Sequence, residues 1–164
     1  MSVAVPTPSA RAATPADVPS IAAMAEAAAS SLHEARGADL LLLRESQPPD
    51  ATTIAEWLHE GDVGVFVGTL DDTVVGAGVA RLEVLTGGTR LAVVTMLWVD
   101  EDARAVGVGE ELLAGLVAWA RAAGCASIDA YALPGERITK NFFEAAGFKA
   151  RLLTVSHRLD DKST

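Results

Sequence analysis

A glycine loop between an apolar run and a helical pattern is the part of the sequence best suited to bind a phosphate. Residues 91–99 are apolar and β-branched, an acidic turn follows, and then comes Arg104-x-x-Gly107-x-Gly109. A helix that begins directly after such a loop presents N–H groups without intrahelical partners, at the positive end of its dipole. Glycine has no Cβ, so a pyrophosphate could approach the backbone closely at Gly107 and Gly109. The spacing therefore predicts a phosphate cradle.

Two well-known glycine loops do not fit this stretch. The phosphate loop of nucleotide triphosphatases needs Lys and then Ser or Thr after its last glycine, but Glu110 and Glu111 follow Gly109. The dinucleotide-binding loop needs a third small residue where this chain has Leu112. The remaining pattern, Arg/Gln-x-x-Gly-x-Gly/Ala, resembles the loop that holds the pyrophosphate of acetyl-coenzyme A (acetyl-CoA) in the GNAT superfamily of N-acetyltransferases. For the loop alone, a strand-to-helix turn without a ligand remains the alternative.

Two further stretches are similar to the same family. Residues 11–17 resemble its first strand and helix, and residues 141–148, with Gly147-Phe148 at their end, resemble its closing aromatic-x-x-x-Gly-Phe signature. With three signatures in the family's order, the chain is identified as a member over nearly its whole length.

The residue pattern indicates one α+β domain. Patterns of hydrophobic residues, glycine and proline predict mainly antiparallel strands, with one central parallel pair joined by a helix crossover. The element order β-α-α-β-β-β-α-β-α-β is that of the GNAT fold, with residues 40–43 left unassigned. The expected strands are 11–13, 63–70, 74–84, 90–99, 126–133 and 148–158, and the expected helices are 14–36, 50–61, 107–123 and 136–146.

Hydrophobic content, cysteine count and net charge exclude several classes of protein. Half of the 164 residues are hydrophobic, which suits one packed domain over residues 11–159, with a disordered lead at 1–10 and a tail at 160–164. The single cysteine, Cys125, excludes an intramolecular disulfide and a multi-cysteine zinc site. No apolar stretch approaches the ~18 residues of a membrane span, so a cytoplasmic protein is expected. The net charge of −9 argues against nucleic acid and favours a cationic amine as substrate.

The resemblance implies which residues bind acetyl-CoA. In the family, the strand before the loop splays from its parallel neighbour, and its N–H groups bind the pantetheine and the acetyl oxygen. Packing under a helix is the alternative for Trp98, and a solvated surface position is the alternative for Arg104. The residues assigned to acetyl-CoA are Leu97, Trp98, Val99, Arg104, Ala105, Val106, Gly107, Val108, Gly109, Glu110, Lys140, Asn141 and Phe143.

The catalytic half of the family pattern is not matched. Phe143 stands where the family usually carries a tyrosine acid, and Glu136 stands where an asparagine is frequent. Tyr131 and Glu83 are the substitute candidates for proton transfer, and a half-buried aromatic and an exposed carboxylate are their structural alternatives. The CoA thiolate could also leave unassisted and take its proton from water.

The sequence therefore predicts an N-acetyltransferase. It would move an acetyl group from acetyl-CoA to a primary amine of a small molecule or peptide, by direct attack in a ternary complex and without a metal. A non-catalytic acyl-CoA-binding regulatory domain is the alternative. A homodimer is left open.

Overall fold

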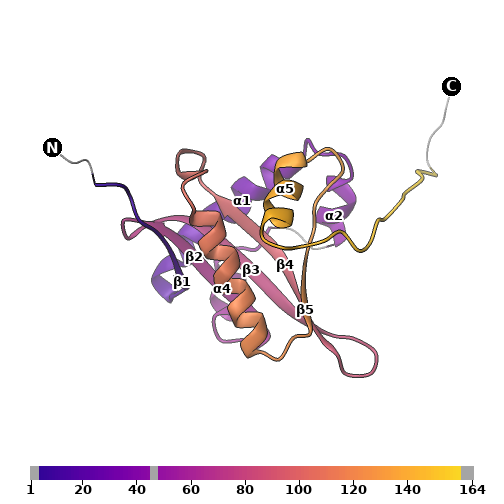
Figure 1. Cartoon of the computed structure of the whole chain (residues 1–164), viewed down its shortest axis with the longest axis horizontal. Coiled ribbons are helices and arrows are strands. Elements are labelled where there is room, and N and C mark those ends of the chain that lie inside the picture. The colour runs from indigo at the N-terminus through magenta and orange to yellow at the C-terminus, as the bar shows by residue number, and fades with distance from the viewer. Residues whose placement is uncertain (1–3, 45–47, 160–164) are drawn as a thin grey trace.

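A mixed β-sheet with helices on both faces forms the fold of residues 4–44 and 48–159, the residues that the computed structural model describes (Figure 1). The strands lie in chain order across the sheet. The first three pairings are antiparallel and the last, β4 with β5, is parallel. The strands are β1 (Pro8–Ala12), β2 (Val63–Leu70), β3 (Thr73–Val84), β4 (Arg90–Val99) and β5 (Ser127–Ala130).

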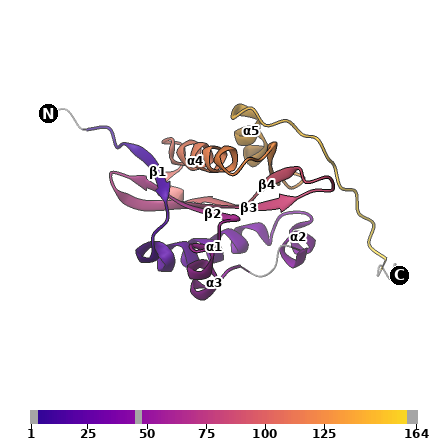
Figure 2. The same ribbon diagram turned by 90° about the horizontal axis from the view of Figure 1, so that it is seen from below.

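Helices cover the sheet in two layers (Figure 2). One layer holds α1 (Val18–Leu32), α2 (Ala38–Arg44) and α3 (Ala51–Trp57). The other holds α4 (Val108–Ala122), which crosses from β4 to β5, and α5 (Arg137–Ala145). This confirms the predicted α+β class, the antiparallel meander and the parallel pair joined by a helix.

Glycines in β2 allow α4 to pack close to the sheet. A Cβ at Gly64 would lie 2.6 Å from the ring of Trp119, and one at Gly68 would lie 2.5 Å from Val108 Cγ1. Any larger residue at either glycine would push the helix outward, because a protein core has no spare volume. Gly64 and Gly68 in β2 therefore set the distance between α4 and the sheet, and with it the position of the glycine loop.

The start of α1 is fixed to β1 by charge. Arg11 forms two hydrogen bonds to the carboxylate of buried Asp17, at 2.7 and 3.0 Å. The backbone N–H of Thr14 also donates to Asp17 Oδ2, at 2.8 Å, as the capping pattern predicts. The hydrogen bond from Arg11, the largest cause, lowers the pKa of Asp17 from 3.8 to about 2.

Several element boundaries differ from those predicted. Strand β1 begins at Pro8, so residues 8–10 belong to the sheet and not to a disordered lead. The run 40–43 lies in α2, and the first helix ends at Leu32 instead of Arg36, because Gly37 with φ of +83° separates the two helices. Residues 1–3 of the predicted lead and the tail 160–164 lie outside the described residues.

The predicted last strand, 148–158, is wrong for this structure. No strand follows α5 in the residues described up to 159, and β5 ends at Ala130 instead of Leu133. A strand pattern needs a neighbouring backbone to pair with, and segment 148–159 lies along no other strand. In the same described part of the chain, no helix is both long and apolar enough to cross a membrane.

Candidate active site

The parallel strands β4 and β5 separate part of the way along the sheet. Their last pair is Val94 with Ala130, whereas β4 continues to Val99. Five residues of β4 thus extend beyond the pairing. We call this opening between residues 95–99 of β4 and the chain after Ala130 the wedge. The family resemblance predicted such a splay, and the pairing places it directly before the glycine loop.

The hydrogen bonds to β3 show which groups of β4 face the wedge. The N–H of Asp100 donates to the carbonyl of Val75 at 2.8 Å, so Asp100 faces β3. Since residues of an antiparallel ladder alternate between facing the partner and facing away, the backbone of Trp98 also faces β3. The N–H groups of Leu97 and Val99 therefore point into the wedge.

A β-bulge accompanies the separation of the strands. Val79 pairs with Met96 and the next residue, Ala80, pairs with Val94, so Thr95 is an extra residue on β4. Its hydroxyl lies 3.4 Å from the carbonyl oxygen of Val79. A bulge bends its strand and changes which face the following side chains take, so the bulge turns the end of β4.

The bulge also determines on which face of the sheet each side chain at the end of β4 lies. Val94 and Leu97, three residues apart, pack in the same cluster with Leu116 of α4. Met96 and Trp98 pack on the opposite face, against the cluster that contains Ile21 of α1 and Ile54 of α3. The side chain of Trp98 thus packs under helices, which was the structural alternative for this residue.

The loop after β4 turns back onto the strand. Arg104 Nε donates to the carbonyl oxygen of Val99 at 2.9 Å, and its guanidinium carbon lies 4.8 Å from the ring centre of Trp98. Two residues then take the left-handed backbone region, Ala105 with φ of +63° and Gly107 with φ of +99°. A left-handed alanine is strained, so the loop is held in shape by its surroundings.

The first turn of α4 opens beside the wedge. The first helical hydrogen bond runs from the N–H of Glu111 to the carbonyl of Gly107, so the N–H groups of Val108, Gly109 and Glu110 have no intrahelical partner. The side chain of Val108 is buried, whereas those of Glu110 and Glu111 are exposed. The turn therefore presents backbone donors, with its two carboxylates in solvent.

Three phenylalanines join α5 to the start of α4. Phe143 is buried and contacts the rings of Phe142 and Phe148, with ring centres 5.4 and 5.3 Å apart. A Cβ at Gly109 would lie 3.3 Å from Phe142 Cε2, so this ring packs against the first turn of α4. Of the other predicted residues on α5, Asn141 is exposed and Lys140 forms an exposed ion pair with Glu144 at 3.1 Å.

The structure separates the two candidates for proton transfer. Tyr131 directly follows Ala130, the last paired residue of β5, and therefore lies at the mouth of the wedge with 46% of its surface exposed. Glu83 pairs with Leu91, at the opposite end of β4 from Val99. Leu91 is six residues from Leu97, the nearer of the two N–H donors in the wedge, and six residues of strand are roughly 20 Å long, so the structure does not bring Glu83 to these donors.

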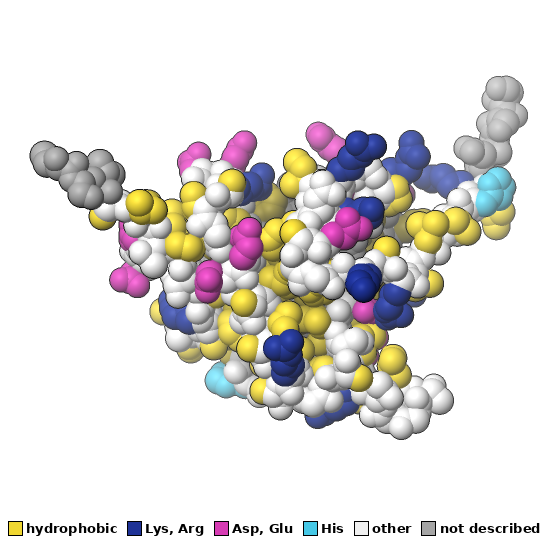
Figure 3. Space-filling model, in the orientation of Figure 1, with side chains coloured by type: hydrophobic (Ala, Val, Ile, Leu, Met, Phe, Trp, Pro, Cys, Tyr) yellow, Lys and Arg dark blue, Asp and Glu magenta, His cyan; other side chains and the backbone are white. Residues whose placement is uncertain are grey.

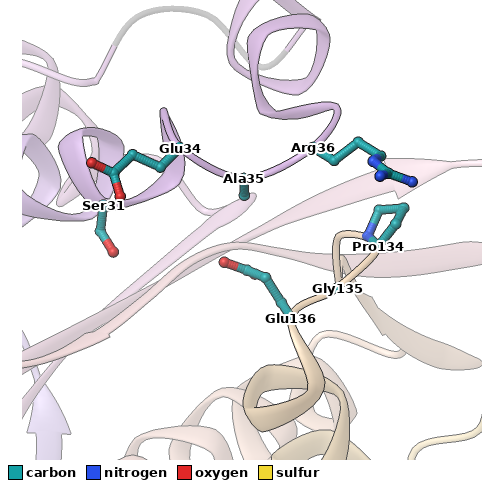
Figure 4. A pocket seen from close by; sticks show the side chains of 7 residues that line it. All are labelled: Ser31, Glu34, Ala35, Arg36, Pro134, Gly135 and Glu136. Atoms are coloured by element: carbon teal, nitrogen blue, oxygen red, sulfur yellow. The ribbon is translucent and has the colours of Figure 1, made fainter.

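A surface pocket of about 350 Å³ lies between the end of α1 and the loop from β5 to α5 (Figure 4). The side chain of Glu136 points toward the α1 side, where Ser31 and Glu34 lie, whereas Arg36 projects toward Pro134. Pro134 is three residues after Tyr131, so the pocket begins within about 10 Å of the mouth of the wedge.

Sequence reasoning missed this pocket. The two walls are about 100 residues apart in the chain, and no local pattern connects them. The one available signal was Glu136, the acidic residue at the family's usual asparagine position. Between residues 4 and 159, gap 45–47 excepted, no group of three His, Cys, Asp or Glu side chains could hold a metal ion.

Comparisons with known proteins agree with this geometry. Residues 29–148 match the model of the "Acetyltransferase (GNAT) family". No curated protein matches the sequence.

Solved acetyltransferase structures share the fold at low sequence identity. One from Trypanosoma brucei is 18% identical, with a TM-score of 0.65 over 93% of this chain and 100% of that chain. Aminoglycoside N-acetyltransferase AAC(6')-Iy in complex with CoA is 16% identical, with a TM-score of 0.71 over 98% and 100%. An aminoglycoside acetyltransferase from an uncultured soil metagenomic sample, in complex with trehalose, is 15% identical, with a TM-score of 0.68 over 93% and 97%.

The family match includes the wedge, the glycine loop and α4, and it covers most of the 164 residues. The chain therefore belongs to the acetyltransferase (GNAT) family.

Proposed function

We propose that the protein transfers the acetyl group of acetyl-CoA to a primary amine of a small molecule or peptide. The observation that carries this proposal is the wedge, which has the first turn of α4 on one side and the pocket lined by Glu34, Arg36 and Glu136 close to its mouth. Acetyl-CoA and an amine could thus meet in one ternary complex. Because acetyl-CoA is a cytoplasmic metabolite, we propose that the protein acts in the cytoplasm.

The first turn of α4 would hold the pyrophosphate. Its N–H donors and the positive end of the helix dipole favour an anion, and Arg104, which donates to Val99 at the end of β4, adds a positive charge to the loop. The loop from Ala105 to Gly109 would enclose the phosphates with its backbone. Glu110 would contribute its N–H group and keep its side chain in solvent.

The end of β4 would hold the thioester arm. The N–H groups of Leu97 and Val99 face the wedge, so they are the donors that we assign to the pantetheine and the acetyl oxygen. Trp98 would contribute by supporting Arg104. Lys140, Asn141 and Phe143 come from α5, which packs against Gly109 through Phe142 and so lies along the same route.

The pocket would hold the acceptor. Its two carboxylates, Glu34 and Glu136, suit a protonated amine, since charge-assisted hydrogen bonds to carboxylates are stronger than neutral ones, and the one cation in the lining, Arg36, projects toward Pro134. The negative net charge of the chain also attracts cations. A solved structure with a TM-score of 0.70 to this chain holds AAC(6')-Iy with a bisubstrate analogue of CoA and acetylneamine, which supports the assignment of both substrates to neighbouring sites.

The reaction that we propose needs no acyl-enzyme. The ammonium first loses a proton to water or to a pocket carboxylate, and the neutral nitrogen then attacks the thioester carbon. The carbonyl oxygen becomes an oxyanion, stabilised by backbone N–H groups of β4. The nitrogen, positively charged after the attack, gives its second proton to water, the C–S bond breaks to leave the neutral amide, and the CoA thiolate takes a proton from Tyr131 or from water.

A thiol-release assay with acetyl-CoA and a panel of amines tests this function. The panel contains polyamines, amino acids, aminoglycosides, peptides and arylamines. We expect turnover with cationic acceptors and a KM raised about tenfold or more in Glu136→Gln, because a charged hydrogen bond is worth about 1.5–3 kcal/mol. The matched control is Glu60→Gln, an exposed glutamate after α3, which should leave KM unchanged.

One result would favour the second candidate function, a non-catalytic acyl-CoA-binding domain. Phe143, buried between Phe142 and Phe148, supplies no proton where the family usually has a tyrosine. Tight CoA binding without turnover on any amine would support that role and contradict the proposed transfer.

A further inference from the structure

The pocket between the end of α1 and the start of α5 carries charges of both signs. Glu34, Arg36 and Glu136 line it. Within residues 4–44 and 48–159, none of these three charged side chains forms an ion pair with another side chain. Their charges are therefore available to a bound ligand.

The fold keeps the cation of this pocket apart from its two carboxylates. Glu34 and Arg36 are two residues apart, and Figure 4 shows their side chains leaving the chain in opposite directions, with Arg36 toward Pro134. Glu136, on the facing wall, points toward the side where Ser31 and Glu34 lie. The pocket thus has an acidic part with two carboxylates and a basic part with one guanidinium.

Backbone turns hold both walls of the pocket in place. The N–H of Ala35 donates to the carbonyl of Leu32 at 2.9 Å, and the N–H of Ala38 donates to the carbonyl of Ala35 at 3.2 Å. Ala38 is fully buried, so it fixes this stretch to the core. On the facing wall, the N–H of Glu136 donates to the carbonyl of Leu133 at 3.1 Å. The charged side chains therefore project from fixed backbone positions, which lowers the cost of ordering them around a ligand.

The surface next to the pocket is basic, although the chain as a whole has a net charge of −9. Residues 137–151 contain one acidic residue, Glu144, and the exposed cations Arg137, Lys140, Lys149 and Arg151. Figure 3 shows Lys and Arg side chains around α5 and the segment that follows it. A ligand that carries both signs of charge is attracted by the acidic protein and by this basic surface beside the pocket.

We propose that the acceptor is a diamino acid, an amino acid with a second amine, such as lysine. This inference rests on the proposed acetyl transfer and names the substrate class of the same site. The carboxylate of the ligand pairs with Arg36, whose planar guanidinium matches a carboxylate in two parallel hydrogen bonds. Glu34 and Glu136 attract its amines. The pocket volume of about 350 Å³ suits a ligand of this small size.

Arg36 separates a diamino acid from acceptors that carry only positive charge. A polyamine or an aminoglycoside has no carboxylate, so its ammonium groups would share the pocket with an unneutralised guanidinium. Like charges brought together in a binding site reduce affinity. The flexible four-carbon arm of lysine also lets one amine stay in the pocket while the other extends toward the mouth of the wedge.

Thiol-release kinetics with lysine and cadaverine test this substrate class, because cadaverine is lysine without its carboxylate. For the wild type, we expect a KM for lysine about tenfold or more below that for cadaverine. Arg36→Gln should raise the KM for lysine about tenfold or more and should not raise the KM for cadaverine. The matched control is Arg44→Gln, an exposed arginine at the end of α2 that does not line the pocket, which should leave both KM values unchanged.

The outcomes distinguish the substrate class from the proposed function. Equal KM values for lysine and cadaverine in the wild type, or an equal rise of both in Arg36→Gln, would overturn the diamino acid and leave acetyl transfer intact. Absence of turnover with every amine would contradict the proposed function itself. Calorimetric titration of the CoA-bound protein with lysine then tests the pocket alone. Binding that Arg36→Gln weakens about tenfold or more would support the diamino acid, and no binding of lysine would overturn it.

Discussion

Arg104 closes the glycine loop onto the strand before it, by donating from Nε to the carbonyl oxygen of Val99 at 2.9 Å. The carbonyl group of Val99 faces the wedge, as its N–H group does. This hydrogen bond therefore holds the guanidinium of Arg104 where the wedge meets the loop. The guanidinium also lies over Trp98, at 4.8 Å, which limits its movement. Arg104 is therefore both a structural link in the loop and a fixed positive charge.

Two substitutions of Arg104 should weaken CoA binding to different degrees. Arg104→Ala removes both the hydrogen bond and the charge, and we expect the Kd to rise about tenfold or more. Arg104→Lys keeps the charge but cannot reproduce the Nε donor, so its Kd should lie between those of the wild type and the alanine variant. Calorimetric titration with CoA measures both values. Arg121→Ala, at the far end of α4, is the control, and equal affinities for Arg104→Ala and wild type would show that the cation is dispensable.

Tyr131 at the mouth of the wedge should matter for turnover and not for CoA binding. If Tyr131 supplies the proton, Tyr131→Phe should lower kcat by more than tenfold with an unchanged Kd for CoA, because a general acid contributes a factor on the order of 10² or more. Steady-state kinetics with a cationic acceptor, run across pH, measures the effect. An unchanged kcat would show that water protonates the leaving thiolate.

The pair Arg11–Asp17 should make stability depend on pH in the acid range. The folded pKa of Asp17, about 2, is below its unfolded value of 3.8, so its contribution is complete above pH 4 and is lost as pH falls toward 2. A shift of this size corresponds to about 2 kcal/mol. Urea unfolding of wild type and Asp17→Asn should therefore differ by up to about 2 kcal/mol at pH 7 and converge near pH 2.

The control for this pH dependence is Asp72→Asn, in the exposed turn between β2 and β3. Asparagine tolerates the φ of +65° that Asp72 adopts, so this variant should match the wild type at every pH. A difference between wild type and Asp17→Asn that stayed constant with pH would contradict the role of the charge.

Local patterns in the sequence were sufficient to predict the elements that carry the cofactor loop. Strand β4 and helix α4 lie within one residue of their predicted ends. The reason is physical: an unbroken apolar run fixes the strand, and Gly107 and the helical period after it fix the start of α4. The family resemblance added the splay of β4 from β5.

Long-range contacts could not be predicted in this way. The bulge at Thr95 depends on how β3 and β4 pair, and it decides that Leu97 and Val99, not Trp98, direct their N–H groups into the wedge. The pocket joins Glu34 to Glu136 across about 100 residues of chain. The strand pattern after Phe148 was visible in the sequence, but whether a strand forms there depends on a partner backbone that a local pattern does not supply.

The central claim is that acetyl-CoA binds at the glycine loop, and a matched pair of aspartate variants tests it. Gly107 has φ of +99° and lies at the start of α4, where an added Cβ would lie 3.2 Å from Pro8 Cγ. Gly87 has φ of +88° but lies in the turn between β3 and β4, at the opposite end of β4, where an added Cβ would have nothing within 4 Å. Aspartate brings the same charge and a similar backbone strain to both positions.

Calorimetric titration with acetyl-CoA is the deciding measurement, with thermal unfolding to confirm that each variant is folded. We expect one binding site in the wild type, the same affinity in Gly87→Asp, and an affinity about 100-fold weaker or lost in Gly107→Asp, because the substitution adds bulk and a negative charge at the start of α4, beside the proposed pyrophosphate site. Equal affinities in all three proteins, or no binding by the wild type at millimolar acetyl-CoA, would contradict the account.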